Sequence, residues 1–359
     1  MVAPAYLIQA LTGELTAPPV PTPEITGFEV REGAPAWGFE VLDCNTESEL
    51  PNIKSFIDRT SALALVAAKI ALADAALARE SRPAGVEIGC AYGSALGCLE
   101  AMGIFWNKVK TSNPKFAQPL AFTQSYANSP SSLLCIEYGL HGAAATFSGE
   151  RLAALEGVLF AFDQIASGSA EIVLAGGSES LSPAAHRHLQ ASGQLSRSGQ
   201  WDDGIVPGEG AVMLILESEE SAKRRKAKIY AEIEGINFFP LDPKSTVAPI
   251  QLATDPRETL VFMSTPNINP DGGWGSPLMA AELSVATKFY TGDMLSVSPV
   301  LGIALSAGVL QGRYQLAMAG KKGLPLLHPA KEALKVRYAM ATGYEPNGWL
   351  GVAMLKQCS

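Results

Sequence analysis

The sequence predicts an α/β protein, and two observations lead to this prediction. Stretches with apolar residues at helical spacing alternate along the chain with short apolar stretches that are typical of strands. Such an alternation is expected where helices pack on the faces of sheets. The 359 residues are 47% hydrophobic and 17% charged, which is typical of a globular chain long enough to form two packed halves, each with a sizeable core.

The first elements follow from local patterns. Residues 5–10 form a short strand-like apolar stretch, and the proline-rich residues 18–23 predict an extended loop. Residues 56–78 carry apolar side chains at helical spacing and many alanines, which favour a closely packed helix. Residues 86–90 predict a short strand.

The rest of the chain continues the alternation. We predict a helix at residues 150–166, a strand at 171–175, a turn at Gly176-Gly177 and a buried strand at 211–216. The basic run at residues 223–228 ends a helix, and we expect a solvated helix end there rather than a docking patch. Residues 229–234 and 349–355 predict two further strands.

Composition and charge narrow the classes of function. The net charge of −8 argues against broad binding to nucleic acids or anionic membranes. The five cysteines show no CxxC spacing, so we expect buried thiols in a reducing compartment and no metal site. We also expect no signal peptide and no membrane span, because the chain lacks a basic start with an apolar run and any window of eighteen apolar residues. These features predict a cytoplasmic protein.

Two segments carry a resemblance to a known family. Residues 138–151 read Tyr-Gly-Leu-His-Gly-Ala-Ala-Ala-Thr-Phe-Ser-Gly-Glu-Arg, and after a helical run residues 176–179 read Gly-Gly-Ser-Glu. Residues 203–217 read Asp-Gly-Ile-Val-Pro-Gly-Glu-Gly-Ala-Val-Met-Leu-Ile-Leu-Glu. Both segments resemble β-ketoacyl synthases, and the resemblance is good from about residue 55 to 235 and looser elsewhere.

The resemblance implies the thiolase-like fold of that family, which is a five-layer α-β-α-β-α arrangement of two similar halves. Residues 1–225 would form the N-terminal ketosynthase-like half, and residues 226–359 would form a shortened C-terminal half. No internal repeat is visible in the sequence itself.

Arg151 stands where the resemblance places the family's nucleophilic cysteine. A guanidinium stays protonated at any working pH and cannot attack a thioester. The side chain either fills and neutralises the former site or points outward, unless the two sequences are offset at this point. The family's two histidines are also absent from the matching stretches, residues 261–271 and 295–308. The four histidines of this chain lie elsewhere, at His141, His186, His188 and His328.

Ser148 is the alternative nucleophile near this position. A serine needs a positioned base and an oxyanion hole, and no Gly-x-Ser-x-Gly elbow surrounds Ser148. A role as the N-cap of the following helix, with Arg151 in the first turns, is the simpler interpretation.

An apolar stretch with large side chains predicts a contact surface. In ketosynthase pairs the corresponding region lies at the dimer interface and lines the acyl tunnel, so the resemblance implies that role here, although ordinary core packing is an equally good explanation for each residue. The candidates are Leu99, Met102, Phe105, Trp106, Phe116 and Phe122, together with Ala144, Thr146 and Phe147 of a strand expected to pair with the partner.

The resemblance is greatest to a chain-length factor, the non-catalytic subunit of a type II ketosynthase heterodimer. It implies a partner, a catalytically active β-ketoacyl synthase, whose tunnel this chain completes. It implies no cofactor of its own, because the phosphopantetheine of an acyl carrier protein would bind through the partner. Two alternatives stay open: an altered acyltransferase or hydrolase that uses Ser148 or a cysteine, and a non-catalytic homodimeric scaffold.

Overall fold

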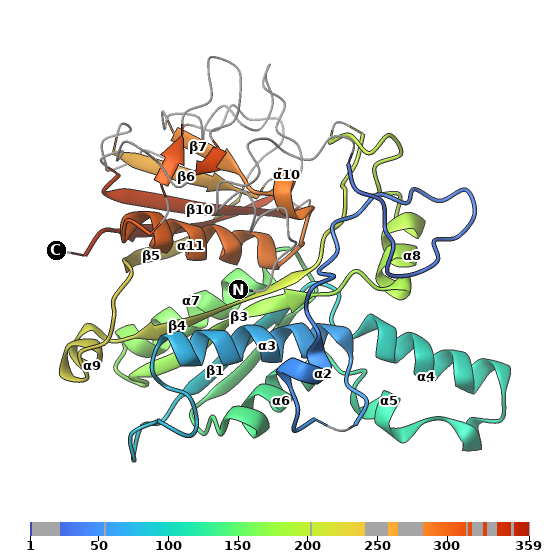
Figure 1. Ribbon diagram of the computed structural model, residues 1–359, viewed down its shortest axis with the longest axis horizontal. Helices are drawn as coiled ribbons and strands as arrows, with labels where there is room; N and C mark the ends of the chain where they lie inside the picture. Colours follow the sequence, from blue (N-terminus) through green and yellow to red (C-terminus); the bar gives the residue numbers. More distant parts are fainter. Residues whose placement is uncertain are drawn as a thin grey trace.

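The computed structural model describes residues 1, 22–53, 55–201, 203–240, 258–264, 283–313, 315–317, 326–328, 336–345 and 348–358. They form two sheets with helices between them and on one outer face (Figure 1). The strand-like residues 5–10 and residues 18–21 of the predicted loop lie outside the described residues.

The first sheet has the order β2-β1-β3-β4. Its strands are β1 (Gly89–Ser94), β2 (Ala144–Ser148), β3 (Ile172–Glu179) and β4 (Gly210–Glu217). The strand β1 runs parallel to β2 and β3, whereas β4 is antiparallel to β3. Residues 203–217, one of the two segments that resemble ketosynthases, therefore end in β4, which is an edge strand of this sheet.

The predicted turn at Gly176-Gly177 is wrong, because both residues lie within β3. The reason is close packing with a helix rather than a change of direction. A Cβ atom on Gly177 would lie 2.8 Å from Ala154 Cβ, and one on Gly93 of β1 would lie 2.3 Å from Ala154 Cα. These glycines let the helix that carries Ala154 approach the sheet.

The second sheet has the order β5-β11-β10-β6-β7. Its strands are β5 (Glu232–Pro240), β6 (Thr259–Met263), β7 (Leu283–Ala286), β10 (Tyr338–Glu345) and β11 (Trp349–Lys356). The central strand β10 runs parallel to β6 and antiparallel to β11. A separate short pair is formed by β8 (Gln315–Ala317) and β9 (Leu326–His328).

The layers follow from which side chains are buried together. The helices α3 (Arg59–Asp74) and α6 (Ser129–Tyr138) cover the outer face of the first sheet. The helices α7 (Ala153–Ala166) and α11 (Val297–Leu310) lie between the two sheets and share one core with both of them (Figure 1). This arrangement confirms the predicted α/β class and the thiolase-like layering.

The far face of the second sheet is also apolar. Leu260 and Phe262 of β6 point into the shared core, whereas Val261 and Met263 pack with Met340 on the opposite face. This alternation is the expected consequence of the two-residue period of a strand. The fifth layer, which would cover that face, lies outside the described residues.

The remaining described helices lie at the ends and edges of the layers. They are α2 (Thr46–Glu49), α4 (Leu99–Thr111), η1 (Pro114–Phe116), α5 (Pro119–Thr123), α8 (Pro183–Ala191), α9 (Glu219–Arg224) and α10 (Lys288–Thr291). The helices α4 and α5 extend away from the two sheets (Figure 1).

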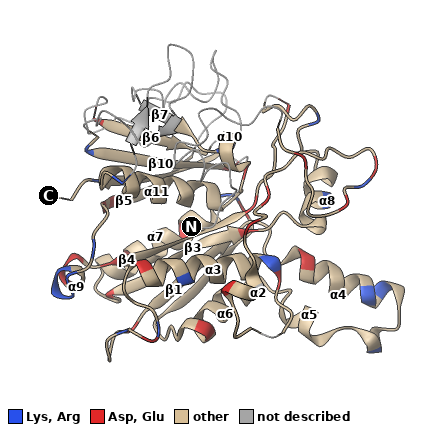
Figure 2. Cartoon of the chain, viewed as in Figure 1, with Lys and Arg blue, Asp and Glu red and all other residues tan. Residues whose placement is uncertain are grey.

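The basic run at residues 223–228 ends α9, as predicted, and Figure 2 shows basic and acidic residues close together at this helix. The pairs are Lys223 with Glu219, Arg224 with Glu171 and Arg225 with Glu217, at 2.5 to 2.6 Å. Much of the positive charge of this run is therefore balanced within the chain, which supports a solvated helix end over a docking patch.

Candidate functional site

Arg151 lies in the turn between β2 and α7 and is 9% exposed. Its Nη1 atom donates to Asp293 Oδ2 over 2.6 Å, and its Nη2 atom donates to Gln194 Oε1 over 3.3 Å. The side chain therefore points inward and occupies the site, and the outward orientation is wrong. A buried guanidinium needs such partners, because a buried unpaired charge is very costly.

The position of Asp293 is set by the backbone around it. Asp293 N donates to Val206 O over 2.8 Å, and Gly208 N donates to Asp293 O over 3.0 Å. Gly292 has a φ of +68°, and a Cβ atom there would lie 2.6 Å from Pro207 O, so only glycine fits this turn. The ketosynthase-like segment at 203–217 thus holds the carboxylate against Arg151.

The residue that pairs with Arg151 lies directly ahead of residues 295–308, one of the two stretches that match the family's histidine segments. The dipeptide that faces residue 151 is Gly292-Asp293, at the turn between α10 and α11. The available signal in the sequence was a glycine followed by an acidic residue directly ahead of an apolar helix. Sequence reasoning missed Asp293, and it also missed Gln194.

Lys288 of α10 is a second cation near this pair and is 3% exposed. Burial lowers the pKa of Lys288 to about 8, Asp293 opposes that shift, and Arg151 adds to it. The Nζ atom lies 5.2 Å from the ring centre of Trp201. The surroundings of Arg151 are therefore a buried cluster of charged groups, and sequence reasoning did not identify Lys288 as part of it.

Glu345, the last residue of β10, reaches the start of α7 from the second half of the chain. Its Oε1 atom accepts a hydrogen bond of 2.5 Å from Leu152 N, and the residue is 3% exposed. Burial and then the neighbouring carboxyl of Glu150 raise the pKa of Glu345 to about 8. No local pattern in the sequence indicated this contact.

Ser148 ends β2 and is exposed. The helix α7 begins at Ala153 with Leu152 as its N-cap, so the predicted capping role of Ser148 is wrong. Within the described ranges, no histidine or carboxylate forms a hydrogen bond with Ser148. A hydroxyl without a positioned base remains a weak nucleophile.

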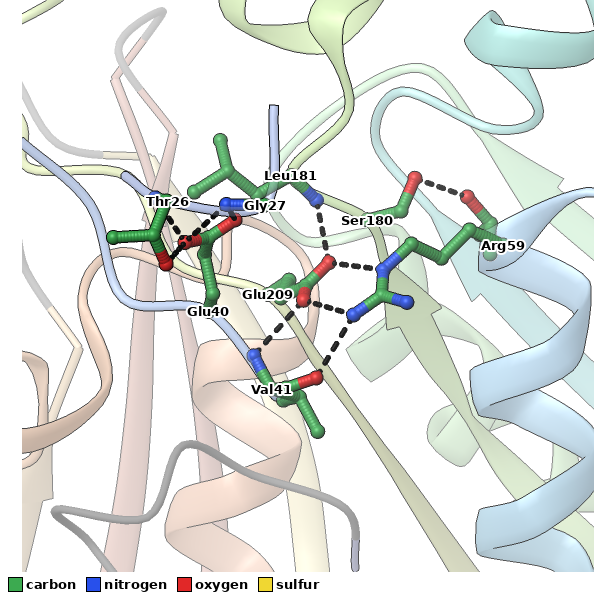
Figure 3. Close-up of polar contacts among 9 residues, drawn as sticks. Thr26, Gly27, Glu40, Val41, Arg59, Ser180, Leu181 and Glu209 are labelled. Carbon is green, nitrogen blue, oxygen red and sulfur yellow. Dashed lines mark hydrogen bonds and ion pairs between the residues drawn. The ribbon is translucent and has the colours of Figure 1, made fainter. Parts of the chain in front are cut away.

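The carboxylate of Glu209, in the ketosynthase-like segment, has a structural role (Figure 3). It accepts hydrogen bonds from Val41 N, Leu181 N and Arg59 Nε at 2.8 to 3.0 Å, and Arg59 Nη2 lies 2.5 Å away. Arg59 also donates to Val41 O over 2.9 Å. We name residues 22–45 the strap, and Glu209 joins the strap to α3 and to β4.

Glu179, at the end of β3, is the acidic residue of the Gly-Gly-Ser-Glu stretch. It accepts from Ala95 N and Ser296 Oγ at 2.5 Å and from Leu96 N at 3.2 Å. Burial raises the pKa of Glu179 to about 7. Because Ser296 precedes α11, this carboxyl connects the two halves next to the Arg151 cluster.

Four of the nine predicted interface side chains, Met102, Trp106, Phe116 and Phe122, are exposed on the segment that runs from α4 to α6, which we name the α4–α6 face. Its exposed large side chains are Met102 (40%), Ile104 (37%), Trp106 (51%), Phe116 (68%), Leu120 (53%), Phe122 (42%), Tyr126 (52%) and Ile136 (71%). Leu99 and Phe105 are half-buried. The Phe105 ring packs on Phe122 with a centroid distance of 5.1 Å and on Trp106 with 5.6 Å.

The strand β2 lies at the edge of the first sheet and, among the described strands, pairs only with β1. Ala144 is exposed, and Thr146 and Phe147 are half-buried. Thr146 Oγ1 lies 2.7 Å from Ser131 Oγ of α6, which connects this edge to the α4–α6 face. An open edge and an apolar surface next to one another form a candidate interface.

None of the helices that the structure describes is long and apolar enough to cross a membrane. In the same part of the chain, no three His, Cys, Asp or Glu side chains converge in a way that suits a metal ion.

Comparisons with known proteins agree with the family that the sequence resembles. Residues 30–222 match the model of the beta-ketoacyl synthase N-terminal domain. The chain is 30% identical over 227 residues to 3-oxoacyl-[acyl-carrier-protein] synthase 2 of Vibrio cholerae serotype O1. This alignment covers 60% of this chain and 54% of that relative. The chain thus spans about half the length of the curated relatives it matches.

Solved structures extend the likeness in fold to nearly the whole chain. The ishigamide ketosynthase/chain length factor superposes with a TM-score of 0.78 and 20% identity, covering 99% of this chain and 94% of that chain. The structure of a type II polyketide synthase acyl carrier protein in complex with its ketosynthase superposes with a TM-score of 0.68 and 18% identity. This match covers 89% of this chain and 90% of that chain. The match over residues 30–222, together with the two-sheet architecture, establishes that the chain belongs to the beta-ketoacyl synthase family.

Proposed function

We propose that this chain is a non-catalytic ketosynthase-like subunit, a chain-length factor. It pairs with an active β-ketoacyl synthase, completes the acyl tunnel of that partner and limits product length in type II polyketide, polyene or fatty-acid-like synthesis. The observation that carries the proposal is the buried ion pair between Arg151 and Asp293, at the position of the nucleophile.

The chemistry of this pair supports a silent site. Acyl transfer to an enzyme needs a nucleophile and a group that accepts its proton. Arg151 offers neither, since its guanidinium stays protonated. Asp293 already accepts from Arg151 and from Leu295 N, at 2.6 and 2.9 Å. The thiol that receives the acyl group must then come from the partner, and the phosphopantetheine of the carrier protein would bind there.

The α4–α6 face and the edge of β2 support an obligate partner. Isolated soluble chains rarely expose so many large apolar side chains in one region. The half-buried ring of Phe105 packs against Phe122 of α5, and we assign it to the wall of a tunnel shared by two subunits. A partner strand beside β2 would also satisfy the open edge of the sheet.

Co-expression with a cysteine-bearing ketosynthase, followed by native mass spectrometry, tests the proposal. We expect a one-to-one complex. Phe116→Glu, on the α4–α6 face, should weaken this complex by at least about tenfold, since burying a charge in an apolar contact is costly. Leu42→Glu is the matched control, because Leu42 is an exposed apolar residue (64%) on the strap. Homodimers alone, or equal effects of the two variants, would contradict the proposal.

The two alternative functions make different predictions. A homodimeric scaffold would form a stable pair without any ketosynthase, and native mass spectrometry of the chain alone would detect that pair. An altered acyltransferase or hydrolase would take an acyl label as an isolated chain, and Ser148→Ala would abolish the labelling. The exposed position of Ser148 makes the second alternative the weaker one.

A further inference from the structure

Two cysteines, Cys90 and Cys135, face each other where α6 covers the first sheet. Cys90 lies in β1, is 1% exposed and packs with side chains of α3 and α6 in the outer core. Its neighbour Ala91 packs instead with side chains of α7 in the core between the two sheets. Because successive side chains of a strand point to opposite faces, the thiol of Cys90 points toward the layer that contains α6.

A contact between α6 and β2 fixes how the helix lies on the sheet. Ser131 Oγ of α6 lies 2.7 Å from Thr146 Oγ1 of β2. The end of α6 leads within a few residues into the start of β2, so the helix and the strand run in opposite directions. A step forward along α6 is therefore a step back along β2.

The spacing along both elements then brings the second thiol to the first. Cys135 lies one turn beyond Ser131, about 6 Å along the helix axis. Ala144 lies two residues before Thr146, about 6.6 Å back along the strand. Cys135 is thus placed over Ala144, which is the partner of Cys90 in the pairing of β1 with β2.

The two thiols differ in exposure and in acidity. Hydrogen bonding with the Cys90 thiol lowers the pKa of Cys135 to about 7, while burial acts in the opposite direction. The same hydrogen bonding, and then burial, raise the pKa of Cys90. Cys135 is half-buried and open to small molecules, whereas Cys90 is enclosed. Cys135 therefore has the properties of a reactive thiolate, and Cys90 those of a second thiol held beside it.

We propose that Cys90 and Cys135 are a redox-active thiol pair that a peroxide converts into an intramolecular disulfide. The pair is separate from the Arg151 site and needs no partner subunit. In a reducing compartment structural disulfides are rare, and a disulfide that forms there is usually transient and redox-sensing.

The reaction has two steps. The thiolate of Cys135 attacks one oxygen of hydrogen peroxide, the O–O bond breaks and hydroxide leaves, which gives a sulfenic acid at Cys135. The sulfur of Cys90 then attacks the sulfur of this sulfenic acid. The S–S bond forms, the S–O bond breaks, and the hydroxyl leaves as water with the proton of the Cys90 thiol. The two cysteines together lose two electrons, and the peroxide gains them.

The bond would fasten α6 to the strand beneath it. Ile136, directly after Cys135, is 71% exposed on the α4–α6 face. Oxidation should therefore restrict the motion of a helix that carries part of this apolar surface, and slower amide hydrogen exchange in α6 would report it.

The first experiment uses the full native chain, reduced and then freed of reductant. Hydrogen peroxide is added in steps, free thiols are blocked with iodoacetamide in denaturant, and unreduced peptides are analysed by mass. Cys44 is the matched internal control, because it is also half-buried but burial raises its pKa. We expect a linked peptide that contains Cys90 and Cys135 to form at least about tenfold faster than any oxidation at Cys44.

Two variants at position 90 separate the two steps. Cys90→Ser and Cys90→Ala both prevent the disulfide, but only the serine keeps a hydrogen-bond donor beside Cys135. Sulfenic acid at Cys135, trapped with dimedone, should accumulate in the Ser variant and form more slowly in the Ala variant. Cys98→Ser changes another buried thiol and should leave the linked peptide unaffected.

The result on the native chain is sufficient to overturn the proposal, so it does not depend on whether the variants fold. Oxidation that begins at Cys44, disulfides without preference for Cys90 and Cys135, or two thiols that peroxide leaves unchanged would each do so. Equal trapping at Cys135 in folded Ser and Ala variants would also contradict the activating role of Cys90.

Discussion

The guanidinium of Arg151 lies 2.6 Å from the carboxylate of Asp293, a residue 142 positions further along the chain. The ion pair joins the start of α7 to the turn before α11, and thus connects the two halves of the molecule. The resemblance aligns the nucleophilic cysteine of active β-ketoacyl synthases with position 151. The two charges form a buried, mutually neutralising pair, so a change at either residue should affect stability.

Breaking the pair from one side should destabilise the fold strongly. Arg151→Met leaves the carboxylate of Asp293 buried without its cation, so we expect a loss of about 3–5 kcal/mol in the free energy of unfolding. The double variant Arg151→Met with Asp293→Asn should recover much of this loss, because no charge is left unpaired. Urea denaturation of both variants measures the difference, and a double variant no more stable than the single one would contradict this role.

The stability of the protein should depend on pH through Glu345. The folded state raises the pKa of Glu345 to about 8 from its ordinary value of 4.5, so the folded chain holds a proton there that the unfolded chain releases. The stabilisation is complete below pH 4.5 and is lost as the pH rises through 8, by at most about 1.4 kcal/mol per pH unit.

Glu345→Gln cannot ionise and keeps the hydrogen-bond acceptor for Leu152 N. We therefore expect the native chain to lose stability relative to this variant between pH 5 and pH 8. The raised pKa of Glu179 affects both chains equally and cancels in the comparison. Thermal or urea unfolding at several pH values gives the result, and parallel stability curves for the two chains would refute the prediction.

The strap should depend on Glu209. Glu209→Ala removes the acceptor for Val41 N, for Leu181 N and for the guanidinium of Arg59. We expect faster amide hydrogen exchange at residues 38–42 and a loss of about 2–4 kcal/mol in stability, since a partly buried cation also loses its partner. Glu40→Ala is the control on the strap, as its carboxylate accepts, among the described residues, from Thr26 and Gly27 of the strap itself (Figure 3). Equal exchange in both variants would argue against Glu209 as the anchor.

Product length should respond to Phe105. If the chain limits an acyl tunnel, Phe105→Ala removes a ring from the half-buried side of the α4–α6 face and should lengthen the product of the reconstituted pair. Phe238→Ala, in β5 of the second sheet, is the control, and it should lower stability without changing length. Mass spectrometry of the product measures its chain length. An unchanged length would show that Phe105 does not line the tunnel.

The apolar pattern of the sequence was sufficient for much of the first half. The helix α3, the strand β4 and the helix α7 lie within a few residues of their predicted bounds, because buried faces impose their spacing on the sequence locally. The pattern failed at Gly176-Gly177, where glycine usually indicates a turn but here allows close packing, of Gly176 against β4 and of Gly177 against α7.

The sequence by itself determined the α/β class, the ketosynthase-like segments and the absence of a nucleophile at Arg151, since these depend on residue identity and local spacing. Only the tertiary structure decided that Asp293 pairs with Arg151 and that Glu345 caps Leu152. Those partners are 142 and 193 positions apart. The physical reason is that the packing of α7 and α11 between two sheets, rather than any local pattern, brings these groups together.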